Sequence, residues 1–352
     1  MKRYAVYASA VILSLFFLSC SKNTSSLKNG KLTIIYSGNN GAKIDVCGCR
    51  IPKGGLAKRA TLISQTREKF QNALILDSGA LLYDSNKLTP PLEDNARRRA
   101  ALTLDVVKKT GIDAANIGSM DLTNTADSLL AMKERGLPWL SANIVWKNSG
   151  NLLFPPDTVK TAGSFRVGIF GFMDQNSSGV AFFDETSPLK VLDPAETVRN
   201  EVEKLRKRSD VVIALAYMDL ERVQKLVQDI QGIDLVIVSH TREHSQNSEH
   251  PFFEPLKTGK TLIARCPDGG RVMGVLELNM VKGATDFVDA ITVRDLRPEA
   301  VKSKDKNPKT VSTWTNTFYD LDYRIPINEA IQARIDSVIK LNDDSLKTLQ
   351  TR

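Results

Sequence analysis

Histidine is almost absent from this chain of 352 residues. There are three histidines, His240, His244 and His250, and none occurs earlier in the sequence. A site built only from residues 1–239 therefore lacks imidazole, the most frequent general base and the commonest metal ligand in proteins. In a helix, the His-x3-His spacing of His240 and His244 could bind one metal ion. The polar residues between and after them are more typical of a mobile loop with surface histidines.

The apolar N-terminal run is too short to span a membrane comfortably. Lys2 and Arg3 precede the apolar residues 5–18, whereas a membrane-spanning helix needs about 20 apolar residues. This is the pattern of an export signal, and its end, FLSC, resembles a bacterial lipobox with Cys20 as the lipidated residue. We therefore expect a lipoprotein signal peptide (residues 1–20) and a polar tether (21–30). An uncleaved signal anchor is the alternative.

These signals predict a protein of the cell envelope, anchored to a membrane by lipid and facing the periplasm or lying at the outer membrane. The formal net charge is +8, from 48 basic and 40 acidic residues, and aromatic residues make up only 7%. No aromatic residues are interleaved with basic runs such as residues 97–99, so we expect no nucleic-acid partner. The expected partner is the membrane, and a redox or protein partner stays unidentified.

Cysteine is also scarce, with four residues. If Cys20 carries lipid, Cys47, Cys49 and Cys266 remain. An odd number in an exported protein predicts one disulfide and one thiol, or a site that uses all three.

The remaining pattern predicts an α/β fold, because buried strands alternate with amphipathic helices. We expect one domain at residues 31–295. Residues 296–325 are charged and irregular, which predicts a linker. Residues 326–352 are expected to contain a C-terminal tail helix that Asn328 caps. The main elements are expected as strands at 32–36, 73–76, 112–117, 211–216 and 235–238, and as helices at 56–69, 93–109, 194–208 and 220–231.

Motifs in a fixed order carry a family resemblance. They are the run KLTIIYSGNNGAKIDVCGCRIPKGGLAKRATLI from residue 31, followed by LILDSGALLYD (74–84), GIDAANIGSMDL (111–122), LSANIV (140–145), VGIFGF (167–172), VVIALAYMDL (211–220), GIDLVIVSHT (232–241) and TLIARCPDGGRVMGVLEL (261–278). This order resembles the catalytic domain of calcineurin-like metallophosphatases of the 5'-nucleotidase and UDP-sugar hydrolase family, in a thiol (Cys-Gly-Cys) branch. The resemblance implies a layered α/β sandwich.

The two-metal site that the resemblance implies has degenerate motifs here. Its Asp-x-His falls at Gly38 and Asn40, its bridging Asp at Ala80, and its Asn-His pair at Ser119 and Met120. The later His motifs fall at Ala216-Tyr217 and Ser239-His240-Thr241-Arg242, where only His240 is kept. Alanine and methionine cannot replace the hard ligands of manganese, magnesium or zinc. We therefore expect no standard two-metal phosphoesterase.

Four polar residues near the strand ends, Asp77, Asp121, Asn143 and Asp219, could suggest a different carboxylate site. We interpret them as cap or turn residues.

Cys47-Gly48-Cys49 is the clearest remaining candidate for chemistry, because glycine lets two thiols approach in a tight turn. Neighbouring Arg50 and Lys53 would favour thiolate. Three interpretations stay open: a structural disulfide from Cys47 or Cys49 to Cys266, a redox-active pair, or ligation of one zinc or other soft metal. The family geometry would add His240 to the three cysteines in the last case, giving a Cys3His set that suits zinc.

The sequence thus predicts an exported lipoprotein with a metallophosphatase-like fold, with Cys47 and Cys49 in a thiol redox or soft-metal role and Cys266 as a resolving sulfur. A non-catalytic binding lipoprotein and a metal-dependent phosphoesterase are the alternatives.

Overall fold

The computed structural model describes residues 29–85, 88, 92–123, 125–174, 186–239, 254–266, 268–281, 287–289 and 312–350. The predicted signal peptide, Cys20 and the three histidines lie outside these residues. No helix within the described ranges is both long and apolar enough to cross a bilayer.

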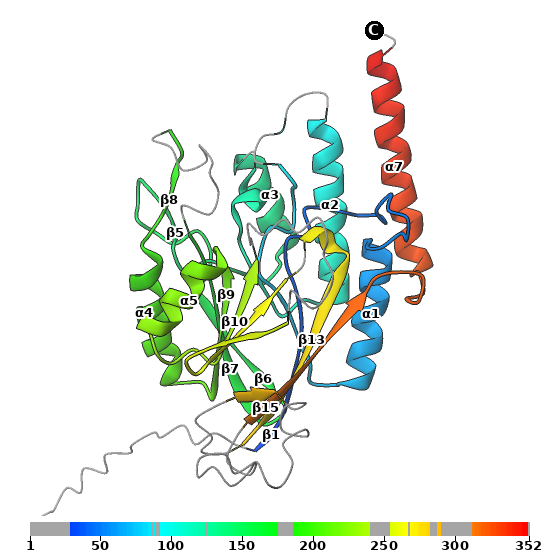
Figure 1. The fold of residues 1–352 in the computed structure, drawn as a ribbon. Coiled ribbons are helices and arrows are strands. Elements are labelled where there is room, and N and C mark those ends of the chain that lie inside the picture. Colours follow the sequence, from blue (N-terminus) through cyan, green and yellow to red (C-terminus); the bar gives the residue numbers. More distant parts are fainter. Residues whose placement is uncertain are drawn as a thin grey trace, which may run out of the picture.

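Two sheets and their covering helices make a four-layer sandwich (Figure 1). The seven-stranded sheet has the order β14-β15-β13-β1-β2-β3-β4, and the six-stranded sheet has the order β11-β12-β10-β9-β7-β6. The strands of the first sheet are β1 (Gly30–Ser37), β2 (Leu74–Asp77), β3 (Ala114–Asn116), β4 (Trp139–Leu140), β13 (Val272–Met280), β14 (Phe287–Asp289) and β15 (Ser312–Asp320). Those of the second are β6 (Asp157–Ala162), β7 (Phe165–Met173), β9 (Val211–Tyr217), β10 (Leu235–Ser239), β11 (Leu256–Thr258) and β12 (Thr261–Arg265).

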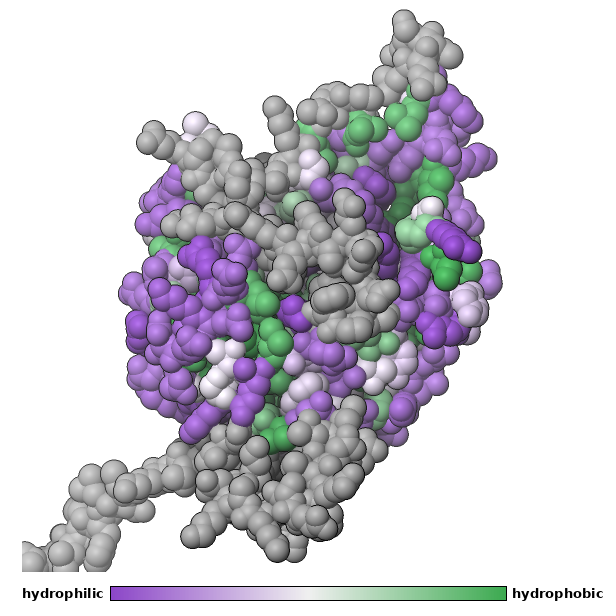
Figure 2. All heavy atoms as spheres, in the orientation of Figure 1, coloured by the Kyte–Doolittle hydropathy of each residue, from purple (hydrophilic) through white to green (hydrophobic). Residues whose placement is uncertain are grey.

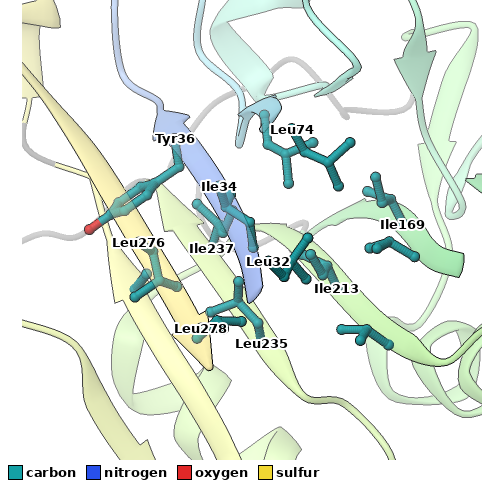
Figure 3. Packing of buried hydrophobic residues seen from close by; sticks show 14 of the residues in the cluster. Leu32, Ile34, Tyr36, Leu74, Ile169, Ile213, Leu235, Ile237, Leu276 and Leu278 are labelled. Atoms are coloured by element: carbon teal, nitrogen blue, oxygen red, sulfur yellow. The ribbon is translucent and has the colours of Figure 1, made fainter. Parts of the chain in front are cut away.

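The two sheets pack face to face through side chains that alternate along each strand. Leu32, Ile34 and Tyr36 of β1 point to the second sheet and meet Ile213 of β9 and Ile237 of β10 in one core (Figure 3). Ile35, between them, faces the opposite way and packs against α1. Strand β9 is buried at every residue because sheet and helices cover both of its faces.

Helices cover the outer face of each sheet. The first sheet carries α1 (Leu56–Lys69), α2 (Glu93–Thr110) and α3 (Thr125–Arg135), and the second carries α4 (Pro194–Arg206) and α5 (Leu220–Asp229). Helix α7 (Glu329–Gln350) packs on the outside of α1 and α2. A short 3-10 helix, η1 (Ser119–Leu122), follows β3, and another, η5 (Asp268–Gly270), precedes β13. Strands β5 (Ile144–Trp146) and β8 (Leu189–Val191) form a separate antiparallel pair. The predicted layered α/β fold with its C-terminal helix is confirmed.

The predicted linker was wrong in its second half. Residues 312–320 form β15, which pairs with β13 through residues 313–320 and with β14 on its other side through residues 312–314. Trp314 is buried in the core between the sheets, and Asn316 accepts a hydrogen bond from the Tyr36 hydroxyl at 3.0 Å. The alternation of Trp314, Asn316 and Phe318 is a strand pattern, which the surrounding charged residues obscured.

The C-terminal helix packs on its own domain. Ile331 and Ile335 of α7 are buried against Leu56 of α1 and Val106 of α2. Asn328 caps the helix as predicted, since its Oδ1 accepts the backbone N–H of Ile331 at 3.1 Å. The helix is therefore part of the domain that the sequence had confined to residues 31–295.

Candidate functional site

The carboxyl ends of the parallel strands meet at one edge of the sandwich, where open α/β folds place their sites. The last residue of β10 and the loop after β2 join the two sheets there. Ser239 donates a hydrogen bond to the carbonyl of Ser78 at 2.7 Å. Asn116, at the end of β3, donates to the same carbonyl at 3.2 Å and to the carbonyl of Phe172 at 2.9 Å. The edge is thus closed by a polar network from both sheets.

A buried ion pair lies beneath this edge. Arg59 of α1 contacts Asp77 at the end of β2 at 3.3 Å, and their side chains are 4% and 0% exposed. Ser37 donates to Asp77 at 2.7 Å and accepts from Arg59 at 2.8 Å. The carboxylate of Asp77 is therefore committed to partners within the protein, and removing Arg59 would leave it as an unpaired buried charge.

Asp121 organises two loops. It is fully buried, and its carboxylate accepts backbone N–H groups from Gly118, Ala80, Leu81 and Leu82 at 2.7 to 2.9 Å. Burial raises its pKa to about 6, although these N–H donors act in the opposite direction. This bonding agrees with our interpretation of Asp121 as a turn residue.

The other three polar residues near the strand ends also have local roles. Asn143 bonds the backbone of Met173 in both directions, at 2.6 and 3.0 Å, and Asp77 pairs with Arg59. Asp219 occupies the N-cap position of α5, but its side chain makes no capping hydrogen bond.

Small or apolar residues occupy the positions where the resemblance placed metal ligands. A Cβ atom added at Gly38 would lie 2.4 Å from Ser78 Oγ and 2.9 Å from Ser239 Cβ. The hydroxyl of Ser119 donates to the Tyr217 hydroxyl at 3.3 Å, and both residues are buried. Ala80 has a φ of 58°, an unusual backbone angle for a residue other than glycine. In the described loops at this edge, the space beside Gly38 and Ser119 is thus filled by neighbouring side chains.

Among the described residues, the side chains at these positions do not supply the ligands of a two-metal centre. Within the described ranges, no group of three or more His, Cys, Asp and Glu residues is arranged to hold a metal ion. His240 lies outside those ranges. Gly38, Ala80 and Ser119 offer no carboxylate or imidazole, and Asp121 has its oxygens occupied by backbone N–H groups.

Cys47 and Cys49 form a disulfide in the loop between β1 and α1, with 5.2 Å between their Cα atoms. Cys47 is half-buried, whereas Gly48 and Cys49 are exposed. The Cys47 N–H donates to the Lys53 carbonyl at 2.8 Å, and the Lys53 N–H donates to the Cys47 Sγ atom at 3.5 Å. The two sulfurs therefore differ: one is held by the loop backbone and the other faces solvent.

Cys266 is not part of this disulfide. It follows β12 and is 1% exposed, and its Sγ atom lies 3.4 Å from Ser78 Oγ. The predicted alternative of a disulfide from Cys47 or Cys49 to Cys266 is therefore wrong in this structure, because Cys266 is buried at the strand-end edge as a thiol. The predicted proximity of Cys47 and Cys49 is present, while His240 lies outside the described residues.

Sequence reasoning missed Arg59 and Ser78 as members of the edge, whereas the motif order had already put Tyr217 at a strand end. An arginine on an amphipathic helix, such as Arg59, is usually predicted to face solvent. A serine directly after a strand, such as Ser78, is usually predicted to be a turn residue. Gly38 was a signal that could have been used. A glycine at a position where the family has a metal ligand indicates that other parts of the chain approach closely there.

Comparisons with known proteins give a consistent picture of the fold. No family model matches the chain. A snake venom 5'-nucleotidase from Naja atra is 28% identical over 240 residues, which cover 64% of this chain and 42% of that protein. The chain thus matches about two-fifths of the length of this relative.

Solved structures share the same fold at lower identity. A 5'-nucleotidase precursor from Thermus thermophilus superposes with a TM-score of 0.69 and 18% identity over 88% of this chain and 59% of its own. A calcineurin-like phosphoesterase from Bacillus subtilis gives a TM-score of 0.66 and 17% identity over 91% of this chain and 100% of its own.

Proposed function

We propose that this chain, which has the layered fold of calcineurin-like phosphoesterases and sequence similarity to 5'-nucleotidases, exchanges thiols and disulfides through Cys47 and Cys49. The observation that carries the proposal is the exposed disulfide between residues two apart in sequence, in a chain whose strand-end edge is filled by side chains.

A purely structural role gains little from so short a loop. In the chain-entropy account, closing a loop of about three residues stabilises a protein by about 1.5 kcal/mol, against about 3 kcal/mol for a loop of about 15 residues. The loop also has a backbone bridge between Val46 and Gly54 and an ion pair between Lys53 and Asp320 at 2.8 Å. These contacts hold the loop without help from the disulfide, which favours a chemical role.

The geometry assigns different roles to the two sulfurs. A thiolate of a partner dithiol attacks the exposed Cys49 Sγ atom, forms a mixed disulfide there and displaces Cys47 as the leaving thiolate. The Lys53 N–H, 3.5 Å from Cys47 Sγ, stabilises that charge. The space around Gly48 is open among the described residues, since a Cβ atom there would have no neighbour within 4 Å.

A second step completes the transfer. The partner's remaining thiolate attacks its own sulfur in the mixed disulfide, so that the partner forms a disulfide and Cys49 leaves as a thiolate. Two electrons and two protons pass in total from the partner dithiol to Cys47 and Cys49. In the reverse direction the reduced Cys47 and Cys49 thiols reduce a disulfide of the partner and are themselves oxidised to the disulfide, and the relative reduction potentials set the direction.

A metal-dependent phosphoesterase is the second candidate, and the sequence similarity to 5'-nucleotidases favours it. Hydrolysis of this type uses metal ions to activate water. Against it stand Gly38, Ala80 and Ser119 at the positions of expected ligands. A non-catalytic binding lipoprotein, and a soft-metal site that includes reduced Cys47 and Cys49 with Cys266 and His240, are further proposals.

We also propose that Cys20 carries a lipid that anchors the domain to a membrane of the cell envelope. The lipobox-like end of the apolar run supports this proposal. Labelling of the full chain with a radioactive fatty acid, and its loss in Cys20→Ala, would test it.

Redox titration of the full chain tests the exchange function. The protein is equilibrated in buffers with different ratios of reduced to oxidised dithiothreitol. Its free thiols are then alkylated, and mass spectrometry measures the fraction of reduced protein. We expect a reversible two-electron transition that disappears in both Cys47→Ser and Cys49→Ser. Cys266→Ser serves as the matched control and keeps the transition. A pair that no dithiothreitol buffer can reduce would overturn the proposal.

Elemental analysis of the full chain distinguishes the phosphoesterase and the soft-metal site from the exchange function. Two ions of manganese, zinc or iron per chain, with phosphoesterase turnover that Cys47→Ser leaves unchanged, would establish the hydrolase. One zinc ion that is lost in Cys47→Ser would establish the soft-metal site.

A further inference from the structure

A groove begins beside the disulfide loop. Its volume is about 520 Å³, and it lies between the loop that follows β1, helix α2 and helix α7. The lining residues are Lys43, Ile44, Asp45, Val46, Leu92, Asn95, Arg99, Ile339, Asn342 and Asp343. Figure 1 shows the blue loop passing beside the orange-red helix α7. This groove is separate from the polar network at the strand ends.

Apolar side chains continue from the groove along the loop. Val46 lines the groove, is 38% exposed and directly precedes Cys47. Leu92, at the start of α2, is 55% exposed, and Ile51, just beyond Cys49, is 52% exposed. Figure 2 shows apolar surface next to the rim formed by α7. Exposed apolar side chains that join into one patch mark contact surfaces for other polypeptides.

One cation in the groove has unmet hydrogen-bonding capacity. The Nε atom of Arg99 is buried and has no hydrogen-bond partner among the described residues. Burial acts to raise the pKa of Asp84, but the ion pair with Lys43 at 2.5 Å and the nearby charge of Arg99 lower it. Of the groove's acidic groups, Asp45 accepts the Val46 N–H at 2.8 Å, and Asp343 lies on α7. A carboxylate in the groove would meet the guanidinium group of Arg99.

We propose that this groove docks an extended segment of the protein whose thiol exchanges with Cys47 and Cys49, a segment with apolar side chains and a carboxylate near its cysteine. The inference rests on the exchange function proposed above and names the class of its partner. The apolar side chains cover Val46 and Leu92, and the carboxylate binds Arg99. Docking then holds the partner cysteine at the exposed Cys49 sulfur.

Synthetic peptides test this docking. One peptide carries a single cysteine flanked by leucine and aspartate residues, and a second has lysine in place of each aspartate. Each is mixed with the oxidised full chain, and the rate constant for the mixed disulfide is measured by quenching and mass spectrometry. We expect the aspartate peptide to react about tenfold faster, a ratio that corresponds to about 1.4 kcal/mol.

Two variants locate the preference. Arg99→Gln is expected to remove most of the difference between the peptides, and Val46→Asp is expected to slow the aspartate peptide about tenfold. Arg97→Gln is the matched control on the same helix, because Arg97 is exposed, pairs with Glu93 at 2.5 Å and does not line the groove. Dithiothreitol should reduce all four proteins at equal rates.

The outcomes separate docking from exchange. Equal rates for the two peptides, or a preference that survives in both Arg99→Gln and Val46→Asp, would overturn the docking proposal alone if dithiothreitol still reduces the disulfide. If dithiothreitol fails to reduce it, the exchange function is wrong and the docking proposal falls with it.

Discussion

The packing at Gly38 gives the sharpest prediction about the strand-end edge. Gly38→Ala places a Cβ atom 2.4 Å from Ser78 Oγ, 2.9 Å from Ser239 Cβ and 3.3 Å from Cys266 Cβ. The Ser78 hydroxyl could turn away only by giving up its hydrogen bond to the Ser37 carbonyl at 3.2 Å. The Ser239 Cβ atom cannot turn away, because it is attached directly to the β10 backbone. We therefore expect a loss of about 2 to 3 kcal/mol in the free energy of unfolding, near the upper part of the range for overpacked cores.

Urea denaturation of three variants measures this effect. Ser78→Ala alone should cost about 1 kcal/mol for the lost hydroxyl. In the Gly38→Ala background the same change should cost less or even restore stability, since it removes the nearest atom of the clash. The difference between these two costs is the coupling energy of the pair, expected at about 1 kcal/mol or more.

Gly48→Ala is the control for the glycine change itself. A Cβ atom there has no neighbour within 4 Å, so unfolding should shift by less than about 0.5 kcal/mol. A Gly38→Ala protein as stable as Gly48→Ala would refute the reasoning. It would mean that the edge has room for a side chain, and with it for the ligand that the family places at this position.

Three further predictions concern other parts of the domain. Arg59→Met should cost about 3 to 5 kcal/mol in urea denaturation, because the Asp77 carboxylate is left buried without its partner; an unchanged midpoint would contradict the buried ion pair. Ile335→Ala should cost about 3 kcal/mol while Leu341→Ala, on the exposed face of α7, should cost less than about 0.5 kcal/mol; equal effects would mean that α7 does not pack on the domain. Burial, followed by a hydrogen bond with a neighbouring aspartate, raises the pKa of Glu201 to about 7, so its contribution to stability should be present below about pH 4.5 and be lost as pH rises to about 7; a melting temperature with the same pH profile in Glu201→Gln would refute this assignment.

Much of the fold was predictable because its strands and helices carry strong periodic patterns. The helix expected at residues 56–69 is α1 (Leu56–Lys69), and that at 93–109 is α2, which ends one residue later at Thr110. Gly111 then adopts a left-handed angle that terminates α2. Strand β15 was missed because its inward residues, such as Asn316, are partly polar and its pairing partner lies far away in sequence.

The candidate site was less predictable because it depends on contacts between distant segments. The motif order placed Gly38, Ala80 and Ser119 at strand ends, and the structure confirms those positions. Their packing against Ser239 and Tyr217 follows from how the two sheets meet, which no local pattern encodes. The disulfide partner of Cys47 was equally open in sequence, because spacing alone cannot tell whether Cys266 is within reach.

The central position of β1 has a consequence for how the domain is made. Residues 30–37 pair on one side with β2 and on the other with β13, whose register joins Gly30 to Met280. A chain still in synthesis therefore lacks one neighbour of its first strand until about four-fifths of its residues exist, and β15 comes later still. Contacts of such long sequence separation form slowly. The sheet that contains β1 should thus be completed only late in synthesis, after residues 272–280 have emerged.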